Sequence, residues 1–191
     1  PKRNGDKRPL GIPTMEDRIV QQCIKQILEP ICEAKFYNHS YGFRPNRNAK
    51  HAIVRAMSLM NISKFHYVVD IDIKGFFDNV NHGKLLKQIW SLGIRDKSLL
   101  SIISKILKTE IENVGKMEKG TPQGGIISPL LSNIVLNELD WCISSQWETM
   151  ITRHNYESID KRNNTIIRSH KYTALRRTSN LKEMFLVRYA D

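Results

Sequence analysis

The sequence is short of acidic residues: 19 Asp and Glu face 30 Lys and Arg among 191 residues, so the formal net charge is +11. It also lacks any apolar run near the ~20 residues that a membrane-spanning helix needs, and no secretory signal pattern opens the chain. A basic surface binds phosphates by releasing counterions, without sequence specificity. These features favour nucleic acid as the partner and speak against a membrane.

Cysteine is scarce as well. Cys23, Cys32 and Cys142 are odd in number and lack the spacing of metal ligands, which indicates reduced structural cysteines in an intracellular protein. Internal repeats and low-complexity tracts are absent. With 40% hydrophobic and 26% charged residues, the chain is typical of a folded protein with one domain, or with two small lobes that share a core.

The apolar pattern predicts helices and strands without regular alternation, which favours the α+β class over a doubly wound sheet. Thr14 is expected to cap the first helix, with Glu16 and Asp17 in its first turn. The predicted elements are a basic turn-rich segment at 1–13, helices at 14–31, 48–60, 82–91, 96–107 and 126–147, strands at 65–73 and 184–190, and a hairpin at 110–119.

Carboxylates stand on both predicted strands. Asp72 comes late in the first strand, on the opposite face from Tyr67, Val69 and Ile71, and Asp191 ends the second. If the two meet in the fold, they form a hard-oxygen site suited to magnesium. Two such ions about 4 Å apart can activate a 3′-hydroxyl and stabilise a pyrophosphate leaving group. Spacing alone leaves open that Asp72 is a turn or cap residue.

Five segments, in order, resemble motifs of group II intron reverse transcriptases, and together they cover nearly the whole chain. They are Arg-Pro-Leu-Gly-Ile-Pro-Thr (8–14) with Asp17-Arg18, Tyr-Gly-Phe-Arg-Pro (41–45), Asp-Ile-Lys-Gly-Phe-Phe-Asp-Asn-Val-Asn-His (72–82), Lys-Gly-Thr-Pro-Gln-Gly-Gly-Ile-Ile-Ser-Pro-Leu-Leu (119–131) and Tyr-Ala-Asp (189–191). The resemblance implies the fingers and palm of a right-hand polymerase, with a small antiparallel palm sheet backed by helices.

The resemblance also implies the domain boundaries. Residues 1–65 would be fingers, with part of the fingers recurring at 83–118, and 66–82 with 119–191 would be palm, interrupted by a basic insertion at about 150–183. The family's thumb, its maturase domain and the second Asp of its Tyr-Ala-Asp-Asp motif have no counterpart here. We therefore expect a fingers–palm fragment with weak or no polymerase activity by itself.

By the same resemblance, Asp72 and Asp191 would be the catalytic metal ligands, and the carbonyl of Ile73 would help to hold the nucleotide-bound ion. Asp70 lies on the same predicted strand face and is the rival ligand. Only Asp72 has the family's spacing to the aromatic residue five positions later, Phe77. The resemblance therefore favours Asp72.

The nucleotide-binding residues follow from the resemblance too. The ring of Phe77 would be a steric gate that leaves no room for a 2′-hydroxyl, with a core role as the alternative, whereas Phe76 is expected in the core. Gln123 would lie beside the incoming nucleotide or the primer–template junction, followed by glycines that allow close backbone approach. An ordinary loop before a helix is the alternative. Lys2 and Arg8 resemble fingers residues that clamp the triphosphate.

Basic residues are expected to contact RNA. The stretch before the final strand carries Arg162, Arg168, Lys171, Arg176 and Arg177 among few acids. Its alternative interpretation is a solvated charged face. Arg18 and Arg44 are further expected contacts to template or phosphate, and for both an internal ion pair stays equally open.

The resemblance implies an RNA-directed DNA polymerase with two Mg²⁺ ions, located in the bacterial cytoplasm. Its expected partners are an RNA template with a DNA primer, deoxynucleoside triphosphates, and an intron RNA whose splicing and mobility it assists. Two alternatives stay open: a splicing-only maturase that binds RNA without catalysis, and a reverse transcriptase of a retron or diversity-generating element. Intact Asp72, Phe77 and Asp191 favour catalysis. Whether the protein forms a homodimer is left open by the composition.

Overall fold

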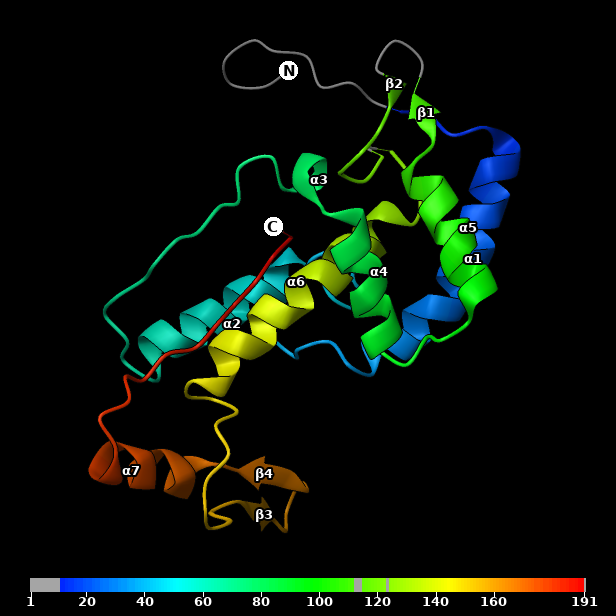
Figure 1. Cartoon of the computed structure of the whole chain (residues 1–191). Helices are drawn as coiled ribbons and strands as arrows, with labels where there is room; N and C mark the ends of the chain where they lie inside the picture. The colour runs from blue at the N-terminus through cyan, green and yellow to red at the C-terminus, as the bar shows by residue number, and fades with distance from the viewer. Residues whose placement is uncertain (1–10, 112–114, 123, 191) are drawn as a thin grey trace. The chain divides into compact units, whose positions relative to one another are not determined.

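A computed structural model describes residues 11–111, 115–122 and 124–190. The chain divides into two compact units (Figure 1). The first comprises residues 1–138 and 187–191, and the second comprises residues 139–186. Each unit is described by itself.

The first unit is built mainly from helices, and their ends follow local sequence signals. Thr14, Asn48, Asn81 and Asp96 each accept a backbone N–H with their side chain and cap a helix, as helix starts require. The predicted helices are thereby confirmed, with small shifts at their ends. They are α1 (Met15–Glu33), α2 (Ala49–Asn61), α4 (His82–Ser91), α5 (Lys97–Leu107) and α6 (Ser128–Ser145), of which residues 128–138 belong to this unit. A short helix, α3 (Phe76–Asn79), adds to them.

One apolar core joins five of these helices, α1, α3, α4, α5 and α6. Its fully buried members come from one stripe of each helix, where residues three or four apart lie on the same side. Ile73 and Phe77 pack against its edge as half-buried residues. The core contains Ile24, Leu28 and Cys32 of α1, Phe76 of α3, Leu85 and Ile89 of α4, Ile103 and Leu107 of α5, and Leu130, Leu131 and Ile134 of α6.

The predicted strand at 65–73 is wrong. This segment lies outside the strands of the described residues (Figure 1), and Tyr67, Val69 and Ile71 are 94%, 82% and 65% exposed. A period-two pattern reports alternating faces, whereas a strand also needs a neighbour to take its N–H and C=O groups. No described residue supplies that ladder, so the carboxylate of Asp72 lies on an exposed segment instead of a buried strand.

The predicted strand at 184–190 is wrong as well. It is extended, with one isolated parallel bridge between Arg188 and Ser40. The described strands form two small antiparallel pairs instead: β1 (Glu110–Ile111) with β2 (Gly115–Lys116), and β3 (Ser158–Asp160) with β4 (Thr165–Ile167). The first pair confirms the predicted hairpin. The chain is thus mixed helix and strand, but the described residues do not form the expected palm sheet.

The second unit contains β3, β4 and a helix, α7 (Ser169–Thr178), whose Tyr172 belongs to an aromatic cluster. The buried ring of Trp147 stacks on Tyr172 with 6.0 Å between centroids, and Tyr172 meets Phe185 edge-on at 5.8 Å. Such ring pairs are favourable geometries that also bury large apolar area. Among the described helices, none is long and apolar enough to cross a membrane.

Candidate functional site

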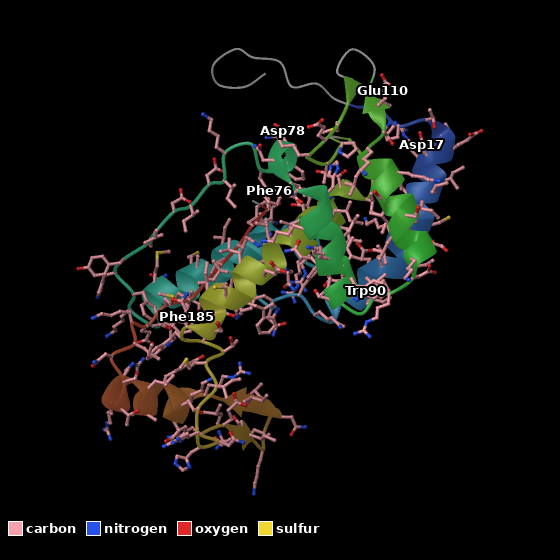
Figure 2. All side chains as sticks on the ribbon, viewed as in Figure 1. Asp17, Phe76, Asp78, Trp90, Glu110 and Phe185 are labelled. Atoms are coloured by element: carbon pink, nitrogen blue, oxygen red, sulfur yellow. The ribbon has the colours of Figure 1, made fainter. Side chains whose placement is uncertain are left out.

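The turn that follows Asp72 is held by the conformation of Gly75 and by a hydrogen bond within the turn. Gly75 adopts a φ of +62°, a conformation that costs glycine little, and starts α3. The side chain of Asn79 donates to the Gly75 carbonyl at 2.9 Å, which closes the turn. The buried ring of Phe76 meets the half-buried ring of Phe77 edge-on at 5.6 Å. Figure 2 labels Phe76 and Asp78 on this short helix.

A second segment, Lys119–Thr121, is bonded to that turn although it lies some forty residues later in the chain. Gly120 N donates to the Val80 carbonyl at 2.7 Å, and Thr121 N donates to the Phe77 carbonyl at 2.8 Å. His82 Nε2 lies 2.6 Å from the Gly120 carbonyl and must donate there, because a carbonyl only accepts. Two of the five motifs therefore form one backbone-bonded unit.

Helix α1 is hydrogen-bonded to the chain a few residues after Thr121. The buried side chain of Gln21 accepts a hydrogen bond from Ile126 N at 2.8 Å. A Cβ on Gly125 would lie 2.7 Å from Ser128 Oγ, which itself donates to the Pro122 carbonyl. Sequence reasoning missed Gln21. The available signal was a polar residue on the apolar stripe of α1, since buried amides need partners.

The expected metal ligands are partly within the described residues. Asp72 is exposed, and the Ile73 carbonyl accepts a bond from Phe76 N at 3.2 Å, which leaves it a second lone pair. Carboxylate and carbonyl oxygens are the donors that magnesium prefers. Among the described residues no three His, Cys, Asp or Glu side chains gather as a metal site, and Asp191 lies outside them.

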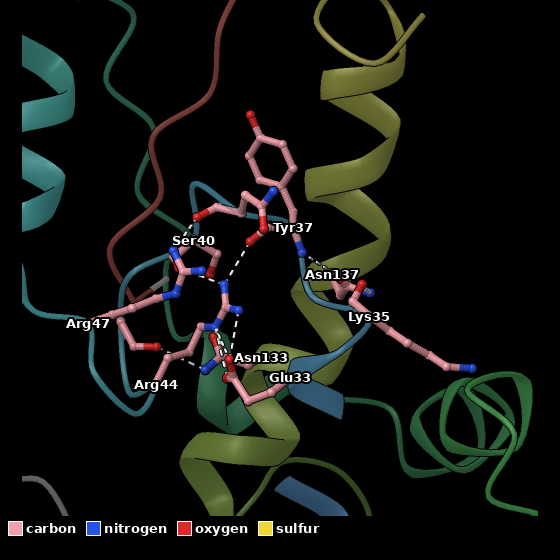
Figure 3. Close-up of polar contacts among 10 residues, drawn as sticks. Glu33, Lys35, Tyr37, Ser40, Arg44, Arg47, Asn133 and Asn137 are labelled. Atoms are coloured by element: carbon pink, nitrogen blue, oxygen red, sulfur yellow. Dashed lines mark hydrogen bonds and ion pairs between the residues drawn. The ribbon is translucent and has the colours of Figure 1, made fainter. Parts of the chain in front are cut away.

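Arg44 has the internal role that the sequence left open. Its guanidinium contacts the Glu33 carboxylate with Nη2–Oε2 at 2.8 Å and Nε–Oε1 at 2.9 Å. Its Nη1 donates to the carbonyls of Tyr37 and Ser40 at 2.7 and 2.8 Å (Figure 3). These bonds occupy most of its five donors. Arg18 is half-buried in the first turn of α1.

The predicted RNA-binding residues of the second unit fall into three groups: paired, buried and exposed. Arg168 pairs with Glu157 at 2.8 Å, which raises the pKa of Arg168 and lowers that of Glu157. Arg176 makes a bidentate pair with Glu183 at 2.7 and 2.9 Å. Lys171 is buried, and burial lowers the pKa of its ammonium, whose Nζ donates to the Glu148 carbonyl. Arg162 and Arg177 have exposed side chains.

Four predicted site residues lie outside the described residues. They are Lys2, Arg8, Gln123 and Asp191. The structure brings the 75–82 turn together with Gly120 and Thr121, and α1 together with Ile126. The predicted triphosphate clamp stays a prediction.

Comparison with known proteins agrees with the motif geometry. The whole chain, residues 1–191, matches the family described as "Reverse transcriptase (RNA-dependent DNA polymerase)". The chain belongs to this family, whose members generally use a divalent metal ion, typically Mg²⁺.

Three similar proteins indicate the kind of reverse transcriptase that this chain resembles. The chain is 43% identical over 147 residues to Protein YkfC of Escherichia coli, and 44% identical over 143 residues to the Group II intron-encoded protein LtrA of Lactococcus lactis; each alignment covers 73% of this chain. It is 31% identical over its full length to the Putative COX1/OXI3 intron 1 protein of Saccharomyces cerevisiae. These relatives confirm the resemblance to group II intron proteins. The chain spans 38%, 23% and 25% of their lengths.

Proposed function

We propose that this chain supplies the fingers and palm of an RNA-directed DNA polymerase encoded by a group II intron. In this assignment residues 1–65 belong to the fingers, and 66–82 with 119–191 belong to the palm. The observation that carries it is the direct bonding of the turn after Asp72 to the segment before Gln123. That bonding fixes the two motifs that the family uses for metal and nucleotide relative to each other.

The metal-binding part rests on donor chemistry. Asp72, the Ile73 carbonyl and Asp191 would hold the ions, which when bound lower the pKa of the primer 3′-hydroxyl and stabilise the departing pyrophosphate. The chain's own contribution is to keep these oxygens in place. Gly75 and Asn79 hold the turn that follows Ile73, and the core fixes Phe76 behind it.

Sugar selection is assigned to the Phe77 ring. It packs against the core and against Phe76, and its carbonyl is bonded to Thr121 N, so the ring has little freedom to yield to a 2′-hydroxyl. A rigid ring rejects a bulkier sugar by steric overlap, as a filled apolar pocket does. Gln123, with Lys2 and Arg8 on the triphosphate, would complete the nucleotide contacts.

Primer extension by the whole protein on a primed RNA template tests this proposal. Asp72→Asn should reduce extension at least about a hundredfold, since a metal ligand contributes several kcal/mol to the transition state. Phe77→Val should raise ribonucleotide use about 10–200-fold relative to deoxynucleotides. Phe76→Leu is the matched control, because it opens the core beside the same turn and should leave sugar selection unchanged. Full extension by the Asp72 variant would refute the proposal.

RNA binding by the basic segment at about 150–183 is the second part of the proposal. Arg162 and Arg177 support it best, because their guanidinium groups are exposed and no described residue pairs with them in an ion pair. Arg168 and Arg176 are already paired with carboxylates, so they would contact RNA only by exchanging partners. Such a surface would serve intron binding in a maturase role as well as template binding.

The salt dependence of RNA affinity tests this part. Replacing Arg177 with Ala should lower the slope of log K against log salt by roughly 0.7–0.9, the value for one phosphate contact. Arg95→Ala removes the same charge from an exposed site outside the segment and should leave the slope unchanged. Equal slopes for the wild type and both variants would show that Arg177 in this segment makes no phosphate contact, and would contradict this part of the proposal.

A further inference from the structure

Asn133 is a polar side chain in the buried part of α6, and its two ends bind two different segments. It is 1% exposed. Its Nδ2 donates to the Gly42 carbonyl at 2.9 Å, and its Oδ1 accepts from Arg188 Nη1 at 3.1 Å. A buried amide is costly unless both ends are satisfied, and here the partners lie 91 and 55 residues away.

Arg188 begins the segment that runs directly into Asp191. Its guanidinium, held by Asn133, also donates to the Ala190 carbonyl. Its backbone is bonded on both sides to the 39–41 loop: Tyr41 N donates to the Arg188 carbonyl at 2.8 Å, and Arg188 N donates to the His39 carbonyl at 3.0 Å. The segment is therefore fixed by its backbone and by its side chain.

Gly42 also contacts the 188–190 segment, directly through its backbone. A Cβ built on Gly42 would lie 2.2 Å from Ala190 N and 2.7 Å from Ala190 Cα, so only glycine lets the two backbones approach. Ala190 adopts a φ of +66°, a left-handed conformation that is unfavourable for an L residue. Such a conformation persists where the surroundings impose it. The bonds from Arg188 and the contact with Gly42 are those surroundings.

We propose that Asn133 and Gly42 act as a latch that positions the Tyr-Ala-Asp segment, and through it the Asp191 carboxylate, for metal binding. This inference rests on the proposed function, in which Asp191 is a metal ligand. Asn133 is a positioning residue, because it touches Gly42 and Arg188 and not the metal. The latch also gives the Tyr-Gly-Phe-Arg-Pro motif a second role, because its glycine bears on the active-site segment while its arginine holds the loop to Glu33.

A matched control lies one helical turn further along α6. Asn137 is also buried, and its Oδ1 accepts from Tyr37 N at 3.1 Å (Figure 3). Its Nδ2 donates to the Lys35 carbonyl at 3.5 Å, so among the described residues its bonds go to 35–37 and not to 188–190. Asn137→Leu should lose stability as Asn133→Leu does, without the effect on metal binding that the latch predicts.

The test is Mn²⁺ binding by the whole protein, followed by electron paramagnetic resonance, together with the Mg²⁺ dependence of primer extension. Asn133→Leu and Gly42→Ala should each weaken Mn²⁺ binding about 10–100-fold, the range for residues that orient a metal ligand. Asn133→Asp, which keeps the acceptor for Arg188, should lose less Mn²⁺ affinity than Asn133→Leu. Because Gly42→Ala acts by steric displacement, it reports on the latch even if Asn133→Leu fails to fold.

The outcomes separate the latch from the polymerase assignment. Mn²⁺ affinities unchanged in the folded variants, or lowered equally in Asn137→Leu, would overturn the latch, as would a wild type that binds no Mn²⁺. A protein that shows the expected affinity pattern but extends no primer would keep the latch and refute the polymerase.

Discussion

Gly120 lies against the Phe77 peptide so closely that a Cβ on Gly120 would come within 2.9 Å of the Phe77 carbonyl oxygen. Its φ is +91°, which L side chains rarely adopt. Gly120→Ala should therefore destabilise the protein by about 2–5 kcal/mol, from left-handed backbone strain of roughly 1–2 kcal/mol and overpacking of about 1–3 kcal/mol. Urea unfolding of the protein measures the loss.

Gly115 provides the control for this substitution. It has a similar φ of +87°, but nothing lies within 4 Å of the position of its Cβ. Gly115→Ala should thus cost only the backbone strain, about 1–2 kcal/mol. If both variants lose the same free energy of unfolding, the close approach of Gly120 to Phe77 does not matter energetically.

His82 should stabilise the same junction through its bond to the buried Gly120 carbonyl. His82→Leu leaves that carbonyl without its side-chain donor and should cost about 1–3 kcal/mol. His82→Gln offers an N–H of comparable reach and should recover part of the loss. The midpoint of urea unfolding is the measurement, and a leucine variant as stable as the wild type would contradict this role.

The helices were predictable because their signals are local. Thr14 caps α1 by accepting from Asp17 N, three residues away, so the signal lies within one helical turn. The strand at 65–73 failed because pairing is decided by a distant segment that no local pattern reveals. The burial of Gln21 had a local signal, but its partner Ile126, 105 residues away, could not be foreseen for the same reason.

In the candidate site, too, local motifs could be predicted from the sequence and long-range contacts could not. The motif around Asp72 was visible as a resemblance, whereas its bonding to Gly120 depends on backbone atoms that every residue type shares. The identity of a side chain does not specify such a contact, although a glycine at positive φ marks where it can occur. Arg44 illustrates the limit for charges: the sequence was equally compatible with an RNA contact and with an internal ion pair, and the structure shows this buried arginine in an ion pair with Glu33.

Arg44 is accordingly predicted to act on stability. Arg44→Ala leaves the Glu33 carboxylate and the Ser40 carbonyl without this partner, and should cost about 3 kcal/mol, the lower end for a broken buried pair because Glu33 keeps some access to water. Thermal unfolding measures the loss. Lys25→Ala, which breaks the half-buried (i, i+4) pair with Glu29 on the same helix, should cost only about 0.2–0.5 kcal/mol. RNA affinity of the folded Arg44 variant should stay unchanged; a fall with little loss of stability would restore the RNA-binding role.

Cys32 should make stability fall in alkaline solution. Burial, helped by the charge of Glu33, raises the pKa of the Cys32 thiol from 9.0 to about 12. The thiol therefore stays protonated in the folded state while the unfolded chain ionises above pH 9. The contribution of this group is fully present below pH 9 and is lost between pH 9 and about 12, at about 1.4 kcal/mol per pH unit.

The test compares the pH dependence of unfolding in the wild type and in Cys32→Ala. The alanine variant starts less stable because it leaves a small cavity, but its free energy of unfolding should decline less steeply above pH 9. Cys23→Ala removes an exposed thiol and should keep the wild-type slope. A thiol reagent at pH 8 should likewise modify Cys23 and Cys142 well before Cys32, since only a thiolate reacts and the buried thiol does not ionise there. Rapid labelling of Cys32 in the folded protein would show that α1 opens at this position.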